Sequence, residues 1–241
     1  GIDHVILIIS DNQQSILQYF QNNKEIEDLL QARGDCVLLD SIRKISDLSE
    51  LSFVIQDKPR GLGHAIHLAK SQVGNESFAV LLPDDFIVSD TPTMANMMNM
   101  RPNNDGIVVA LKKVRNEEIP HLGIVDMTIE SGDLIKVKSM IEKPDINEAP
   151  SDIAIIGRYI LPPTIFDSIG RQSPGALGEI QLTDAISSLL QTHSCFGFLF
   201  PGEHFDVGTP AGLLKASVYM ALNRNDIGPQ FTKWIQQELS L

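Results

Sequence analysis

The chain has 241 residues, of which 43% are hydrophobic and 21% charged, a composition that excludes global disorder. Its longest apolar runs, at 5–9 and 78–82, have the length of strands, far below the roughly 18 residues of a membrane helix, and no secretory signal is recognisable. The 19 basic and 31 acidic residues give a net charge of −12 without any basic block, so we expect neither nucleic acid nor a membrane as partner.

The chain contains two cysteines, Cys36 and Cys195. They have no spacing typical of a metal or redox site and are too few for a disulfide framework. We therefore predict that both are reduced residues of the core, and that the protein is cytoplasmic.

The first half of the chain alternates short apolar runs with amphipathic ones, which is typical of parallel-sheet units. Strands are predicted at 5–9, 51–56, 78–82 and 106–111, and helices from about 11 to 20, at 25–33 and at 64–72. Gly34 follows the second helix and is expected to end it.

After Pro120 the pattern changes to closely spaced strands at 122–127, 134–141 and 153–161, with a turn at 131–133. These predict a small antiparallel insertion over 120–161. Helices are then predicted at 163–170, 179–190, 210–222 and 229–239, with strands at 195–200 and 203–206. The predicted fold is one α/β domain over 1–241, a Rossmann-like sheet with helices on both faces and C-terminal helices over 210–241.

Two predicted strands end in carboxylates. Asp84 follows the strand at 78–82, and Asp206 closes the strand at 203–206. Ligands of open parallel sheets bind outside the carboxyl ends of strands. If these two ends adjoin, Asp84 and Asp206 make an oxygen-rich site for Mg²⁺. Each aspartate alone is equally compatible with a turn or a helix cap.

Two further segments carry candidate binding residues. Glu142 and Lys143 end another strand, where lysine suits a phosphate and glutamate accepts hydrogen bonds from sugar hydroxyls, although an exposed charge pair is otherwise ordinary. Gln56 and Gly61 lie in the loop that leads into the helix at 64–72. The amide suits a pyrimidine edge and glycine permits close approach of a ligand, but the glycine is also compatible with a tight turn alone.

Taken together, these segments resemble the bacterial UTP–glucose-1-phosphate uridylyltransferases, also called UDP-glucose pyrophosphorylases. The resemblance extends to the last helix. It rests on Gly61-Leu62-Gly63-His64-Ala65, Leu82-Pro83-Asp84, His121-Leu122-Gly123-Ile124-Val125-Asp126, Ile141-Glu142-Lys143-Pro144, Gly157-Arg158-Tyr159 and Gly178-Glu179-Ile180-Gln181-Leu182-Thr183-Asp184-Ala185.

The resemblance implies transfer of a uridylyl group from UTP to glucose 1-phosphate, with pyrophosphate as the second product and a homodimer or homotetramer as the assembly. It implies roles for the matching positions, which are uracil binding by Gln56 and Gly61, Mg²⁺ binding by Asp84 and Asp206, glucose binding by Gly123 and Glu142, and binding of the sugar phosphate by Lys143. Catalysis would then consist of positioning and charge neutralisation by Lys143 and by the cation on Asp84.

The sequence departs from the family in two respects. Val207 follows Asp206 where cysteine is usual in this family, so the segment is similar to that of nucleotidyltransferases in general and does not by itself define the sugar and the base. The family's first strand and its Gly-x-Gly-Thr-Arg loop have no counterpart in these 241 residues. We therefore expect the chain to be an inactive part of a longer enzyme. The alternatives are a truncated protein that only binds a sugar nucleotide or an oligomeric partner, and a sister enzyme that uses dTTP.

Overall fold

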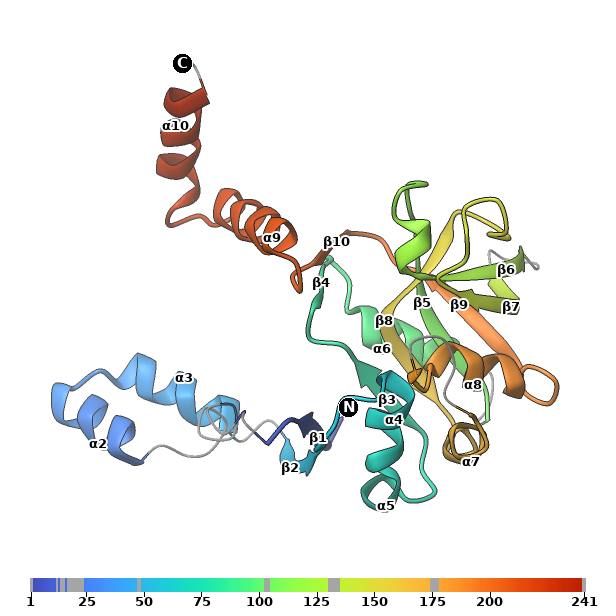
Figure 1. The fold of residues 1–241 in the computed structure, drawn as a ribbon. Coiled ribbons are helices and arrows are strands. Elements are labelled where there is room, and N and C mark those ends of the chain that lie inside the picture. Colours follow the sequence, from blue (N-terminus) through green and yellow to red (C-terminus); the bar gives the residue numbers. More distant parts are fainter. Residues whose placement is uncertain are drawn as a thin grey trace. The chain divides into compact units, whose positions relative to one another are not determined.

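The computed structural model describes residues 2–11, 13, 16, 24–46, 49–101, 105–129, 135–173 and 178–239 (Figure 1). The helix expected from about 11 to 20 and the turn expected at 131–133 lie largely or wholly outside these ranges. The chain groups into two compact units, each made of two segments. Gly1–Glu76 and Pro163–Gln191 form the first, and Ser77–Pro162 and Thr192–Leu241 form the second. The expected single domain over 1–241 stays a prediction.

The first unit contains a two-stranded parallel sheet. Strand β1 (His4–Ile9) pairs with β2 (Glu50–Ile55) in unbroken register. In the described part of the chain between these strands lie the helices α2 (Lys24–Arg33) and α3 (Cys36–Ser46). Gly34 adopts φ 72° directly after α2, and this left-handed conformation ends the helix as the sequence predicts.

The described residues of the first unit also form the helices α4 (Leu62–Leu68), α5 (Lys70–Val73), α7 (Ile165–Gly170) and α8 (Leu182–Leu189). Helices α7 and α8 bury their apolar residues, among them Phe166 and Ile186, and the Ser168 hydroxyl donates to the Ala185 carbonyl at 2.8 Å. These contacts hold together segments that lie far from β1 and β2 in the sequence.

The second unit is built on a six-stranded mixed sheet. Its strands, in spatial order, are β3 (Phe78–Leu81), β8 (Ile153–Leu161), β5 (Ile107–Lys113), β9 (Cys195–Leu199), β7 (Ile135–Glu142) and β6 (Gly123–Ile129), and β6 also pairs with β8. Among the strand pairs that the described residues form in this sheet, only β5 and β9 run parallel. The sheet is therefore more antiparallel than the alternation of elements predicts.

The strands expected to form an antiparallel insertion join this sheet. Strands β6 and β7 do pair antiparallel to each other, but β8 lies between β3 and β5. The reason is burial: every residue of β8 except Arg158 is buried, and such a strand needs apolar cover on both faces. Helix α6 (Thr93–Met100) supplies part of that cover, because Met97 packs in one cluster with Val108, Ile156 and Phe200.

A second, smaller sheet follows directly after β3. Strand β4 (Asp85–Val88) pairs antiparallel with β10 (Glu203–Asp206), so that Asp85 faces Asp206 in the register. The sequence predicts β10 but not β4, because Pro83 and the two aspartates indicate a turn at this point. The turn is real but short, and the chain returns to strand conformation at Asp85.

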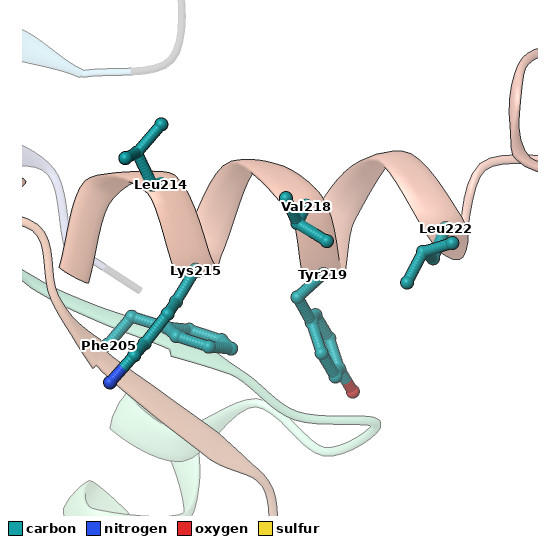
Figure 2. Close-up of a pocket in the computed structure, with 6 residues that line it drawn as sticks. All are labelled: Phe205, Leu214, Lys215, Val218, Tyr219 and Leu222. Carbon is teal, nitrogen blue, oxygen red and sulfur yellow. The ribbon is translucent and has the colours of Figure 1, made fainter. Parts of the chain in front are cut away.

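The remaining elements of the second unit are the 3-10 helix η1 (Ile119–His121) and two C-terminal helices, α9 (Pro210–Leu222) and α10 (Gly228–Leu239). Helix α9 borders an apolar groove of about 470 Å³, lined by Phe205, Leu214, Lys215, Val218, Tyr219 and Leu222 (Figure 2). The rings of Phe205 and Tyr219 lie 5.2 Å apart at their centroids. Among the described residues, no helix combines the length and apolar character that crossing a membrane requires.

The two cysteines differ in accessibility. Cys195 on β9 is buried, as predicted, and burial raises the pKa of its thiol to about 12. Cys36 at the start of α3 is exposed, so the prediction that it belongs to the core is wrong. The prediction failed because a single cysteine in an amphipathic helix does not reveal which face of the helix is covered.

We predict that the native protein reacts with a thiol reagent at Cys36 alone. At pH 8 only on the order of one Cys195 thiol in 10⁴ is ionised, and that thiol is also shielded by the sheet. Titration with a chromogenic disulfide reagent should give one equivalent for the native protein and two after denaturation. Two fast equivalents from native protein would contradict the placement of Cys195.

Candidate functional site

The second unit brings Asp84 and Asp206 together. Asp84 lies in the turn between β3 and β4, and Asp206 is the last residue of β10. A Cβ atom built at Gly208 would lie 3.1 Å from Asp206 Oδ1 and 3.3 Å from Asp84 Oδ2, so both carboxylates converge on the same point. The expected meeting of these two strand ends is therefore observed in the geometry.

Backbone hydrogen bonds fix this convergence. The Val207 amide donates to the Asp84 carbonyl at 2.8 Å, next to the pairing of Asp206 with Asp85. The Asp206 Oδ1 atom accepts from the Gly208 amide at 3.0 Å, which sets the direction of that side chain. The arrangement depends on Gly208, because a side chain at this position would crowd both carboxylates.

The donor set fits a hard divalent cation. Both aspartates are exposed, and neither takes part in a salt bridge with another described residue. The described part of the chain contains no cluster of three or more histidine, cysteine or carboxylate side chains suited to a metal. Two carboxylates nevertheless match Mg²⁺ well, because this ion keeps several waters and is completed by the phosphates of its substrate.

A second cluster lies at the end of strands β6 and β7. Gly123 and Glu142 are direct partners in the register of these strands, and Lys143 follows at once, with its amide donating to the Leu122 carbonyl at 3.0 Å. The Lys143 Nζ atom lies 3.8 Å from Glu142 Oε1. The structure therefore places the three residues expected to bind the sugar and its phosphate next to one another.

Lys143 has a strained backbone. Its φ of 48° makes it the one residue other than glycine with a positive φ in the described part of the chain. Left-handed conformations cost a side-chain-bearing residue about 1–2 kcal/mol and are found preferentially at functional sites. The side chain is about half exposed, so its ion pair with Glu142 is weak and leaves the ammonium group accessible to an anion.

Tyr159 of β8 lies near both clusters. Burial raises the pKa of its phenol, and the carboxylates of Glu142 and Asp85 raise it further. The hydroxyl group is therefore harder to ionise than that of an ordinary tyrosine. Glu142 and Asp85 are thus both close enough to Tyr159 to affect its ionisation.

The first unit holds the other two expected residues, Gln56 and Gly61. Gln56 directly follows β2, and its Nε2 atom lies 2.8 Å from His64 Nδ1. An amide nitrogen only donates, so Nδ1 accepts and the ring proton of neutral His64 lies on Nε2. Burial lowers the pKa of His64, and the positive charges of Arg60 and His67 lower it further, which favours this neutral form.

Gly61 has a structural reason to be glycine. It adopts φ 93°, and a Cβ atom there would lie 2.7 Å from the Ile180 carbonyl oxygen. The Gly63 amide donates to that same oxygen at 2.9 Å, and the Ile180 amide donates to the Arg60 carbonyl at 2.8 Å. The loop at 56–63 therefore packs against the segment around Ile180. At the start of this loop, the hydrogen bond with His64 fixes Gln56.

The sequence gives no sign that His64 contacts Gln56, because the histidine is compatible with simple packing. Asp85 and Arg158 were also not expected at the site, although both belong to segments that carry the family resemblance or adjoin it. Their contacts depend on the pairing of strands that are distant in sequence.

Comparison with known proteins identifies the class. The model of the nucleotidyl transferase family matches residues 1–222. A UTP–glucose-1-phosphate uridylyltransferase of Staphylococcus saprophyticus is 38% identical over 236 residues, which cover 98% of this chain and 82% of that protein. A uridylyltransferase of Staphylococcus epidermidis is 36% identical over 237 residues, with the same coverage.

Comparison with solved structures leads to the same class of enzyme. A UDP-glucose pyrophosphorylase in complex with UDP-glucose superimposes with a TM-score of 0.82 at 32% identity, covering 93% of this chain and 83% of that one. A UTP-bound pyrophosphorylase from Acinetobacter baumannii gives a TM-score of 0.87 at 33% identity, covering 98% and 83%. The chain belongs to the nucleotidyl transferase family and, within it, to the group of the UTP–glucose-1-phosphate uridylyltransferases.

We predict that replacing Lys143 by glycine gives a more stable protein than replacing it by alanine. Both variants lose the amine, but only glycine adopts a φ of 48° without strain, so Lys143→Gly should exceed Lys143→Ala by about 1 kcal/mol. Chemical denaturation of the two variants side by side measures the difference. A lower midpoint for the glycine variant would show that the backbone at this position is not strained.

Proposed function

We propose that this protein transfers the uridylyl group of UTP to glucose 1-phosphate. The observation that carries the proposal is the convergence of Asp84 and Asp206 on one point in a chain of the nucleotidyl transferase family. The names of its relatives, UTP–glucose-1-phosphate uridylyltransferases, supply the substrates.

In the reaction, an oxygen of the glucose 1-phosphate attacks the α-phosphorus of UTP. A new P–O bond forms, the bond to the β-phosphate breaks, and pyrophosphate leaves with the electron pair. The attacking oxygen is already ionised, so no general base is needed. Catalysis of such a step rests on positioning and on neutralisation of charge.

Each cluster of the site has a part in this scheme. Lys143 would bind the phosphate of the sugar, and Gly123 with Glu142 would bind the glucose hydroxyls. Gln56 and Gly61 would bind the uracil. Asp84 and Asp206 would hold Mg²⁺, which when bound neutralises charge on the nucleotide phosphates.

The assembly is proposed to be a homodimer or homotetramer, as the resemblance implies, with UTP and glucose 1-phosphate as the small-molecule partners. The Gly-x-Gly-Thr-Arg loop is absent from these 241 residues. Loss of even one preorganised donor to a phosphate typically lowers the rate about 10²–10³-fold, so we expect little turnover without the loop.

The test uses a version of the protein preceded by the family's first strand and glycine-rich loop. It should form UDP-glucose from UTP and glucose 1-phosphate, and Lys143→Ala should lower this turnover about 10²–10³-fold. Equal turnover of dTTP and UTP would support the sister enzyme instead.

Calorimetry on the 241-residue chain separates the remaining alternative. Binding of UDP-glucose by the chain, without turnover by the extended version, would support a protein that only binds sugar nucleotides. If the chain does not bind UDP-glucose and the extended version does not turn over its substrates, the proposed function is contradicted.

A second prediction concerns the pH dependence of nucleotide binding. Once His64 is protonated, Nδ1 no longer accepts from Gln56, and the amide loses its fixed direction. Because the pKa of His64 is lowered, the neutral form persists to below pH 6.5. Affinity for UDP-glucose should therefore be constant above this value and fall as the pH drops below it.

The matched variant is His64→Asn, whose side-chain oxygen accepts a hydrogen bond near the position of Nδ1 but does not titrate. Its affinity should stay constant over the same range. UDP-glucose suits the experiment because its diphosphate is fully ionised throughout. The same pH profile for both proteins would exclude His64 as the cause.

A further inference from the structure

The turn that carries Asp84 is held by groups that the proposed reaction does not use. Asp85, the next residue, is mostly buried, and both of its carboxylate oxygens accept hydrogen bonds. Oδ1 lies 2.5 Å from His204 Nε2, and Oδ2 accepts from the Gly157 amide at 3.0 Å. Unlike its exposed neighbour Asp84, Asp85 is therefore fully engaged within the protein.

The side chain of Arg158 binds backbone carbonyl groups of the same turn. Its guanidinium donates to the Leu82 carbonyl at 2.8 Å, to the Asp85 carbonyl at 2.6 Å and to the Gly157 carbonyl at 2.8 Å. The carbonyl groups before and after Pro83 and Asp84 are thus tied to one side chain. Burial lowers the pKa of Arg158, and the nearby carboxylates of Asp85 and Asp84 oppose this effect, so the guanidinium stays charged.

An irregularity in β8 directs these groups toward the turn. The pairing of β5 with β8 passes from Val109↔Tyr159 to Ala110↔Ile156, so Gly157 and Arg158 form a bulge. Bulges redirect side chains and occur often beside active sites. A Cβ atom at Gly157 would overlap Asp85 Oδ2 and Leu82, which explains why the turn approaches β8 only at a glycine.

The same contacts reach Asp206. His204, the partner of Asp85, lies two residues before Asp206 on β10, and Asp85 faces Asp206 in the β4–β10 register. Asp85 therefore joins the turn that carries Asp84 to the strand that carries Asp206. We propose that Asp85 and Arg158 are positioning residues that hold Asp84 and Asp206 at the separation required to share one divalent cation.

This inference rests on the metal-binding part of the proposed function, but not on the identity of the nucleotide or sugar. Mutation of groups that orient metal ligands typically lowers metal affinity about 10–100-fold. Positioning by Asp85 therefore predicts a loss of cation affinity in variants that keep both Asp84 and Asp206. A purely structural role predicts a loss of stability with unchanged affinity.

The experiment measures binding of Mn²⁺, as a spectroscopic substitute for Mg²⁺, by electron paramagnetic resonance of the 241-residue chain without nucleotide. Asp85→Asn and Arg158→Lys should each bind Mn²⁺ at least about tenfold more weakly than the original protein, at a temperature well below every unfolding transition. Asp226→Asn removes the same charge from an exposed ion pair with Arg224 and should leave the affinity unchanged.

If Asp85→Asn fails to fold, His204→Gln replaces it, because this variant removes the ring that binds Asp85 Oδ1 but leaves every carboxylate in place. A folded variant with unchanged Mn²⁺ affinity would overturn the proposal. Because no uridine nucleotide or sugar is present, weakened Mn²⁺ binding supports the inference even if the extended protein proves unable to make UDP-glucose.

Discussion

The candidate metal site depends on the pairing of two short strands. Strands β4 and β10 come from distant parts of the second unit, and their antiparallel register sets Asp85 opposite Asp206. The hydrogen bond from the Val207 amide to the Asp84 carbonyl extends this pairing by one step into the turn. Two carboxylates repel each other, so their convergence needs a framework that the backbone itself supplies.

Around this pairing, the structure separates groups that serve the fold from groups left open to a ligand. Asp85 and Arg158 are partly or mostly buried and have their hydrogen bonds satisfied by the protein, as buried polar groups require. Asp84, Asp206 and Lys143 are exposed, and Lys143 keeps a strained backbone conformation. Strain at an exposed lysine does not stabilise the fold, and the proposed binding of a phosphate by Lys143 would account for it.

The sequence predicts most elements and the main features of the site. Buried strands such as β5 are continuous apolar runs, and the positions of Asp84, Asp206 and Lys143 at strand ends suffice to mark them as candidates. The family motifs then assign them chemistry that residue patterns alone leave open.

What the sequence could not predict depends on contacts between distant segments. The place of β8 between β3 and β5 follows from cover on both faces, which no local pattern reveals. The same holds for the bulge at Gly157 and Arg158 and for the hydrogen bond between Gln56 and His64. Exposure of Cys36 was missed for a related reason, since a residue's burial depends on what packs against its helix.

The proposed sharing of one cation by Asp84 and Asp206 can be tested directly. The most direct measurement is X-ray diffraction from crystals of the protein grown with Mn²⁺ and UDP-glucose, with data collected to locate the metal by its anomalous scattering. One strong peak is expected about 2.1 Å from an oxygen of each aspartate and within reach of the diphosphate. A peak bound by only one of the two residues, or located elsewhere in the molecule, would contradict it.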